Sequence, residues 1–214
     1  WFVEFIRLVR LGFSWLHERL HVWRPLGPFL GGVVLAALMT VLPSDYLGLS
    51  LPIMDRALQG EAMPYLGFAW KILLVAITLG SGFYAGIVTP QFVIGAVAGG
   101  AFAPLLGLEP AEGAAVGFVA VVASASNTPV AAVIMGVELF GAGSLLYVAG
   151  ACAAAYLMIG HRSVYPAQEL GYAKSTWIVA APNLPVGQEK LQLSYGLLWW
   201  WGKKLRRRSS RHKR

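Results

Sequence analysis

The sequence predicts an all-α membrane protein with broken and re-entrant helices. Apolar residues make up 57% of the 214 residues and charged residues only 13%, whereas about 25% of residues are charged in a typical soluble domain. No charged residue occurs between Ile72 and Leu108. Gly, Ser, Asn and Pro nevertheless interrupt the apolar segments. Because lipid cannot pair with exposed backbone groups, such breaks are tolerated only where protein buries them or where they line a wet cavity.

The first elements lead from the membrane surface into the bilayer. Residues 1–24 mix Trp, Phe and Leu with arginines, which is typical of an amphipathic helix end and linker at a membrane interface. The apolar segment Leu26–Leu42 comes close to the ~20 residues that cross a bilayer. A loop and a short polar helix, "IMDRALQG" at 53–60, follow it.

The remaining apolar segments predict a series of helices, several of which are too short to cross a membrane alone. In chain order they are Pro64–Gly80, Gln91–Leu106, Ala111–Ala125, Pro129–Phe140 and Ser144–Ile159. Near one end of the first, we expect Lys71 to extend its side chain to the membrane interface. In the second, Gly95 and Gly99 have the four-residue spacing that allows close helix packing.

The segment "GSGFYAGIVTP", Gly80–Pro90, is the most irregular part of the uncharged region. Gly86 permits close approach of the backbone, and Pro90 suits the first turn of a helix. The free N–H groups at the start of that helix can hold an anion, as half-helices do at the midplane of transport proteins. A site made of backbone groups, with no arginine, suits an anion that must also leave.

A second break, "SASNTP", precedes another short helix. We expect Asn127 and Thr128 to cap that helix. Ser124 and Ser126 are candidates to line the same wet region. Glu138 is the one acid inside a long apolar segment, and an intramembrane carboxylate is a functional hypothesis by default. We favour a role for Glu138 as a structural partner, or at the end of a helix, over a role in a proton relay.

Four segments together resemble a known family. "GIVTP" at Gly86–Pro90 is similar to the G-x-F-x-P signature of the CLC chloride channels and chloride/proton exchangers. "SASNTPVAAVIMGVELFG" at Ser124–Gly141 and "GHRSVYPAQ" at Gly160–Gln168 resemble segments that follow it, and "YLGLSLPIMDRAL" at Tyr46–Leu58 resembles the short helix that precedes it. The order and spacing agree, and the resemblance extends roughly over residues 25–170.

The resemblance implies an anion site. The amides of Ile87 and Val88 would contact the central anion, and Tyr165 would supply a hydroxyl. Val88 stands where the family signature has a phenylalanine. Because the contact to the anion is made by the backbone amide, it does not need the phenylalanine ring. Thr89 resembles the corresponding residue in the branch of the family that exchanges fluoride for protons. That branch often has an acidic residue at the position of Ile87. The resemblance therefore implies passage of chloride or a related anion, with a fluoride/proton antiporter as the alternative.

The resemblance also implies a fold and an assembly. The CLC fold consists of two inverted repeats, and this chain resembles the second repeat alone, since the gating-glutamate motif of the first repeat is not found in it. We expect such a half not to form a complete pore by itself. The family is dimeric, which implies a homodimer. A non-transporting scaffold or half-transporter subunit is the remaining alternative.

These observations predict three regions: 1–24, the CLC-like repeat at 25–170, and a polar, basic tail at 171–214. Residues 203–214 contain eight of the 17 lysines and arginines. We expect the tail to lie in the cytoplasm, in solvent or against anionic lipid of the plasma (inner) membrane, rather than on nucleic acid. The orientation of the basic N-terminal segment stays open.

Catalysis and metal binding are not expected. The intramembrane candidates for catalysis are Glu138, Cys152 and serines, and no His lies within the apolar helices to act as a base. His17 and His21 are four residues apart, but two ligands are too few for a metal site, and no cofactor is indicated.

Overall fold

The computed structural model describes residues 2–20, 26–160, 162–169, 178–179 and 192–193. The chain divides into two compact units, Trp1–Ile159 and Gly160–Arg214, and each is described by itself. The described part of the second unit includes a short antiparallel pair of strands, β1 (Ile178–Val179) and β2 (Gln192–Leu193). Most of the basic tail expected at 171–214 lies outside the described residues.

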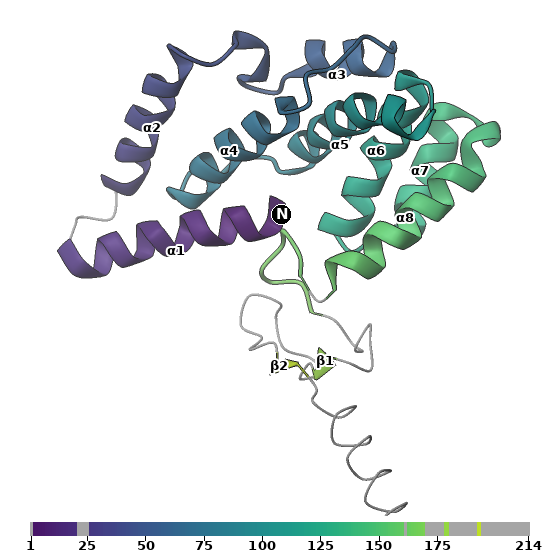
Figure 1. Ribbon diagram of the computed structural model, residues 1–214. Coiled ribbons are helices and arrows are strands. Elements are labelled where there is room, and N and C mark those ends of the chain that lie inside the picture. The colour runs from purple at the N-terminus through teal and green to yellow at the C-terminus, as the bar shows by residue number, and fades with distance from the viewer. Residues whose placement is uncertain (1, 21–25, 161, 170–177, 180–191, 194–214) are drawn as a thin grey trace, which may run out of the picture. The chain divides into compact units, whose positions relative to one another are not determined.

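The described part of the first unit is built from helices (Figure 1). The α-helices are α1 (Phe2–Leu20), α2 (Leu26–Met39), α3 (Leu51–Leu58), α4 (Gly67–Gly80), α5 (Val88–Phe102), α6 (Pro110–Ala125), α7 (Pro129–Phe140) and α8 (Leu145–Ile159). Short 3-10 turns, η1 (Ser44–Tyr46), η2 (Ala103–Leu106) and η3 (Ala142–Ser144), lie between some of them. The all-α fold expected from the sequence is confirmed for this unit.

Helices α5 and α6 touch through their backbones at the centre of the unit. A Cβ atom added at Gly95 would lie 2.8 Å from the carbonyl carbon of Gly117, and one added at Gly99 would lie 2.8 Å from that of Gly113. Because residues further along α5 face residues earlier in α6, the two helices run antiparallel. The close packing predicted from Gly95 and Gly99 is therefore confirmed.

Aromatic side chains connect this helix pair to α7. The ring of Phe92 in α5 stacks on that of Phe118 in α6, with centroids 4.1 Å apart. Phe118 in turn meets Phe140 of α7 edge to face at 5.6 Å. Small buried residues, including Ala96 and Ala114, fill the surrounding core. This packing holds the start of α5 in a fixed place relative to α6 and α7.

Helices α1 and α2 both pack against α4 or the residues that follow it. A Cβ atom at Gly80 would overlap Val9 of α1, and one at Gly31 of α2 would overlap the side chain of Ser81. Leu11 and Trp15 lie on the exposed side of α1. The compact unit Trp1–Ile159 includes α1. The division of the chain into regions 1–24, 25–170 and 171–214 stays a prediction.

The prediction that Lys71 reaches the membrane interface is wrong. Its side chain is only 2% exposed. The ammonium Nζ donates to Tyr46 O at 3.2 Å, to Gly48 O at 2.6 Å and to Ser50 Oγ at 2.7 Å. These three acceptors match the three N–H donors of a lysine and replace the water that a buried charge would otherwise lose.

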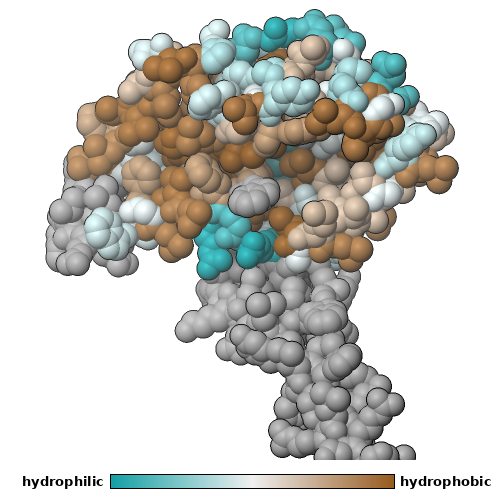
Figure 2. All heavy atoms as spheres, in the orientation of Figure 1, coloured by the Kyte–Doolittle hydropathy of each residue, from teal (hydrophilic) through white to brown (hydrophobic). Residues whose placement is uncertain are grey.

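A polar corner lies around η1 and α3. Arg56 of α3 forms an ion pair with Asp45 of η1. Burial, together with the nearby Asp45 carboxylate, raises the pKa of the Tyr46 phenol above its ordinary value. In Figure 2 hydrophilic residues gather along the top of the molecule, where Figure 1 places α3.

Apolar side chains cover much of the remaining face in Figure 2. By length and composition, two helical segments of the described chain could cross a membrane, Val88–Leu106 and Ala142–Ile159. The other apolar helices, α2, α4, α6 and α7, are shorter. This confirms the prediction that several apolar helices are too short to cross a membrane alone.

Candidate functional site

The helix break predicted at Gly80–Pro90 is present. After α4 ends at Gly80, the chain makes a turn in which Gly82 has a φ of 103°, and no helix resumes before Val88. Ile87 is the N-cap of α5. The helix starts three residues before the predicted start at Gln91, because Pro90 is accommodated as the third helical residue, where no intrahelical N–H bond is needed.

The first turn of α5 presents backbone donors. No side chain caps this helix end, and in the described part of the chain the amides of Ile87, Val88 and Thr89 donate to no backbone carbonyl. Val88 is exposed, Ile87 and Thr89 are half-buried, and Pro90 is buried. The aligned peptide dipoles add partial positive charge at this end. The arrangement can therefore bind a small anion through N–H groups alone.

The role predicted for Gly86 differs in the structure. A Cβ atom at this position would meet nothing within 4 Å, and the residue has no positive φ. Within the described residues, therefore, no segment approaches the backbone of Gly86 closely enough to require a glycine. Its backbone still belongs to the extended segment that leads to the N-cap Ile87.

A further polar residue, which sequence reasoning missed, lies next to this helix start. Gln91 is 0% exposed, and Ser126 Oγ donates to its Oε1 at 3.0 Å. Ser126 directly follows α6, so this hydrogen bond joins the two helix breaks predicted from the sequence. The signal that could have identified Gln91 is a carboxamide directly after Pro90, inside a long uncharged apolar segment.

The break between α6 and α7 is a Schellman motif. Asn127 has a φ of 57°; its N–H donates to Ser124 O at 3.3 Å, and the N–H of Thr128 donates to Ala123 O at 3.2 Å. Asn127 thus occupies the left-handed position that ends α6, whereas the sequence had assigned it to the start of α7. Asparagine suits this position because it tolerates positive φ better than most residues.

Thr128 is the N-cap residue of α7, as its position predicts, but its side chain makes no capping hydrogen bond. Its backbone, with φ −126° and ψ 61°, departs from the extended conformation that a capping side chain normally requires. The reason is that the same residue also closes the Schellman motif of α6. The capping hydrogen bond expected from Thr128 is therefore absent.

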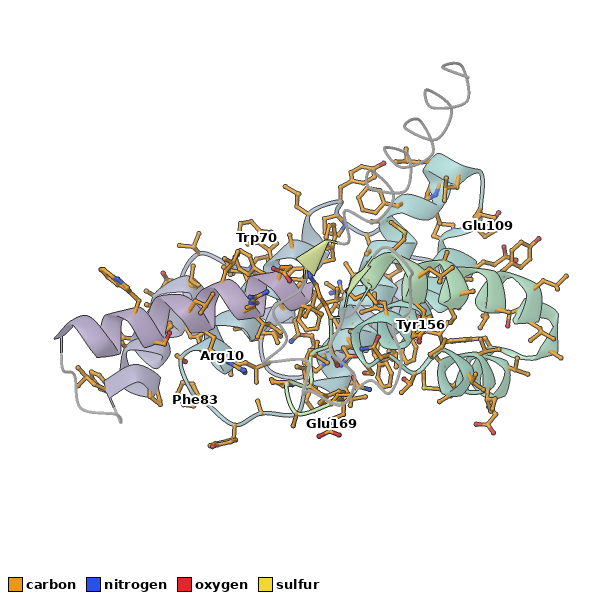
Figure 3. All side chains as sticks on the ribbon, turned by 90° about the horizontal axis from the view of Figure 1, so that it is seen from below. Arg10, Trp70, Phe83, Glu109, Tyr156 and Glu169 are labelled. Carbon is orange, nitrogen blue, oxygen red and sulfur yellow. The ribbon has the colours of Figure 1, made fainter. Side chains whose placement is uncertain are left out.

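The end of α6 and the start of α5 lie at the same end of the helix pair. The hydrogen bond between Gln91 and Ser126 joins the start of α5 to the end of α6 directly. The antiparallel glycine packing of the two helices agrees with this arrangement. In Figure 3, Phe83 before α5 and Glu109 before α6 lie toward opposite sides of the view. Because α7 begins at Pro129, three residues after Ser126, its N-terminus lies in the same region as that of α5.

Glu138 lies on the exposed side of α7, two residues before its last residue, Phe140. Among the described residues it forms no ion pair. A carboxylate near a helix C-terminus is electrostatically unfavourable, since that end carries partial negative charge. A structural partner for Glu138 would therefore have to come from outside the described residues.

Tyr165 belongs to the second compact unit, so its position relative to α5 is not described. Within its own segment, its N–H donates to Ser163 Oγ at 3.1 Å, and its carbonyl accepts from the Gln168 N–H at 3.1 Å. The side chain is exposed within the structure. The hydroxyl contact to an anion stays a prediction.

Metal coordination finds no support in the described ranges, where no group of three or more His, Cys, Asp or Glu could hold an ion. The side chains of His17 and His21 lie outside the residues whose side chains are described. Cys152 of α8 is buried in the hydrophobic core, where it packs as a small apolar residue.

Broken helices whose N-termini lie in one region of an apolar bundle are typical of membrane proteins that transport ions. The family described as Voltage gated chloride channel matches residues 3–160. The chain belongs to this family, which confirms the resemblance found in the sequence. The match begins within α1, in agreement with the compact unit of the structure.

Among the proteins similar to this chain are two curated relatives and one solved structure. A chloride/fluoride channel protein of Pseudomonas syringae pv. tomato is 42% identical over 166 residues, which cover 73% of this chain and 36% of that protein. An uncharacterized protein of Methanocaldococcus jannaschii is 30% identical over 117 residues, covering 52% of this chain and 29% of that protein. The crystal structure of a CLC-type fluoride/proton antiporter superposes with a TM-score of 0.71 and 28% identity, covering 77% of this chain and 41% of that one.

The chain therefore spans about a third of the length of these curated relatives and less than half of the solved chain. This partial coverage agrees with the expectation that the chain corresponds to one half of the inverted-repeat fold.

Proposed function

We propose that this chain forms part of an anion transporter and that the start of α5, Gly86–Pro90, holds the anion. The observation that carries the proposal is the uncapped helix start, whose amides at Ile87, Val88 and Thr89 have no backbone acceptor in the described part of the chain. Family membership supports it, because the match includes this segment. Transport rather than catalysis is the activity that such a site serves.

The mechanism follows from the chemistry of backbone donors. Several N–H groups and the positive end of the helix dipole together stabilise an anion that has lost part of its hydration shell. None of these groups carries a full charge, so binding is moderate and the ion can leave again. The buried glycine contact between α5 and α6 keeps the donors in place.

Chloride, or a related halide, is the transported anion that we propose, and fluoride exchange for protons is a second candidate. The second is favoured by one observation: a relative named a chloride/fluoride channel protein and a structure titled as a fluoride/proton antiporter are both similar to this chain. Thr89 is consistent with that branch, whereas the apolar Ile87 is not.

Other parts of the pathway are also proposals. Tyr165 would donate its hydroxyl to the same anion, and Glu138 would take a structural role toward a group outside the described residues, or a proton-linked one. Because the chain covers less than half of its relatives, a complete pathway needs further protein. We propose a homodimer in the plasma (inner) membrane with the basic tail in the cytoplasm.

The experiment that tests the function is a flux assay on the full-length natural protein in liposomes. Fluoride and chloride efflux are each measured with ion-selective electrodes, with and without a pH gradient. Flux of either anion above protein-free liposomes supports transport, and acceleration of fluoride flux by an opposing proton gradient identifies exchange. No flux of either anion would refute transport and favour a scaffold role.

A further inference from the structure

The carboxamide of Gln91 has a donor without an acceptor. The residue is 0% exposed, and its Oε1 accepts a hydrogen bond from Ser126 Oγ at 3.0 Å. Among the described residues, its buried Nε2 forms no hydrogen bond. Buried donors in native proteins are almost always paired, because an unpaired N–H loses its hydration without compensation. The amide therefore needs an acceptor that the described chain does not supply.

The position of Gln91 places this donor at the helix start. Gln91 is the fourth residue of α5 and so shares a helix face with Val88 and Ile87, three and four positions earlier. Side chains on an α-helix lean toward its N-terminus. This lean directs the carboxamide toward the first turn, whose backbone amides face no carbonyl.

Ser126 holds the carboxamide in one orientation. Its hydroxyl donates to Oε1, which leaves Nε2 as the group available to a ligand. Ser126 is itself buried directly after the end of α6. The segment from Ile72 to Leu108 has no charged side chain, so the donors that this segment can offer are neutral N–H and O–H groups.

We propose that Gln91 Nε2 donates a hydrogen bond to the halide held at the start of α5, and that Ser126 is the residue that positions it. This inference rests on the proposed function and adds a buried carboxamide donor to the backbone amides and hydroxyls already proposed for the site. A neutral amide strengthens binding without the full charge that would retain the ion. A buried water molecule is the competing acceptor.

The test compares three variants of the full-length natural protein, purified in detergent and titrated calorimetrically with sodium fluoride and sodium chloride. Gln91→Met removes the amide at similar side-chain length, and Ser126→Ala removes the hydroxyl that orients it. Gln59→Met makes the same exchange at an exposed position after α3 and serves as the matched control.

We expect Gln91→Met to weaken halide binding about tenfold or more, as loss of a hydrogen bond to a charged partner implies. Ser126→Ala should weaken binding by a smaller factor, and Gln59→Met should leave it unchanged. Unchanged affinity in Gln91→Met would overturn the inference, and so would slower flux at unchanged affinity, because water or a structural role would then explain the amide.

Two further outcomes separate this inference from the proposed function. If the natural protein binds halide but transports none, the proposed function fails, and the affinity of Gln91→Met still decides the inference. If the natural protein binds no halide, both fail. Should Gln91→Met not fold, Ser126→Ala decides alone, and wild-type affinity in that variant would refute the positioning role.

Discussion

Replacement of Gly99 by alanine tests whether the backbone contact between α5 and α6 stabilises the unit. A Cβ atom at Gly99 would lie 2.8 Å from the Gly113 carbonyl carbon and 3.1 Å from Gly117 Cα. Ordinary contacts between carbon atoms are about 3.5–4.0 Å. Both neighbours are backbone atoms, so no side chain can rotate away, and the two helices would have to separate.

Gly100 provides a matched control in the next position of the same helix. A Cβ atom there would have its nearest neighbours at 3.6 Å, which is ordinary van der Waals contact. Both substitutions gain about 1 kcal/mol of helix propensity. Only Gly99→Ala adds the overpacking penalty of about 1–3 kcal/mol. The difference between the two variants therefore isolates that penalty.

The assay is thermal unfolding of each variant in the same detergent, followed by loss of the folded peak in size-exclusion chromatography. At about 2–4 °C per kcal/mol for a protein of this size, Gly99→Ala should unfold roughly 2–12 °C below Gly100→Ala. Equal midpoints would refute the reasoning, since they would show that α5 and α6 separate without loss of stability.

Three further predictions concern Lys71, the anion ligands and Glu138. Lys71→Met should destabilise the protein by about 1–3 kcal/mol in the same unfolding assay, because it leaves buried acceptors at residues 46–50 unpaired; a wild-type midpoint would contradict this. Tyr165→Phe and Thr89→Ala should each change the fluoride-to-chloride flux ratio in liposomes, since each removes a hydroxyl; an unchanged ratio in both would count against the proposed ligands. Glu138→Gln should lower the unfolding midpoint of the full-length natural protein by more than about 2 °C, because the proposed structural role pairs its carboxylate with a group outside the described residues, whereas an unpartnered surface substitution changes stability by only about 0.5 kcal/mol; a smaller shift would contradict that role.

The fold and the position of the site could be predicted from local patterns. Uncharged apolar segments indicated the helices, and glycine and proline marked the break before α5. Gly95 and Gly99 indicated a close contact because a four-residue spacing places them on one helix face. These features depend on residues that are near each other in the chain, which is why sequence periodicity reveals them.

The features that were predicted incorrectly depend on distant partners. The burial of Lys71 requires acceptors more than 20 positions away, and no periodicity indicates them. Asn127 was assigned to the wrong helix because a polar residue between two helices can end the first or begin the second. Gln91 was not identified from the sequence because its hydrogen-bond partner, Ser126, is 35 positions away in the chain.

The buried Lys71 has a consequence for how the protein is synthesised. A charged lysine in a helix that enters lipid is costly, so α4, which carries Lys71 as its fifth residue, would enter lipid more easily with the acceptors already present. Those acceptors, at Tyr46, Gly48 and Ser50, precede the lysine by 25, 23 and 21 residues and leave the ribosome first. The order of the chain thus allows each new copy to form the lysine pocket before its cation arrives.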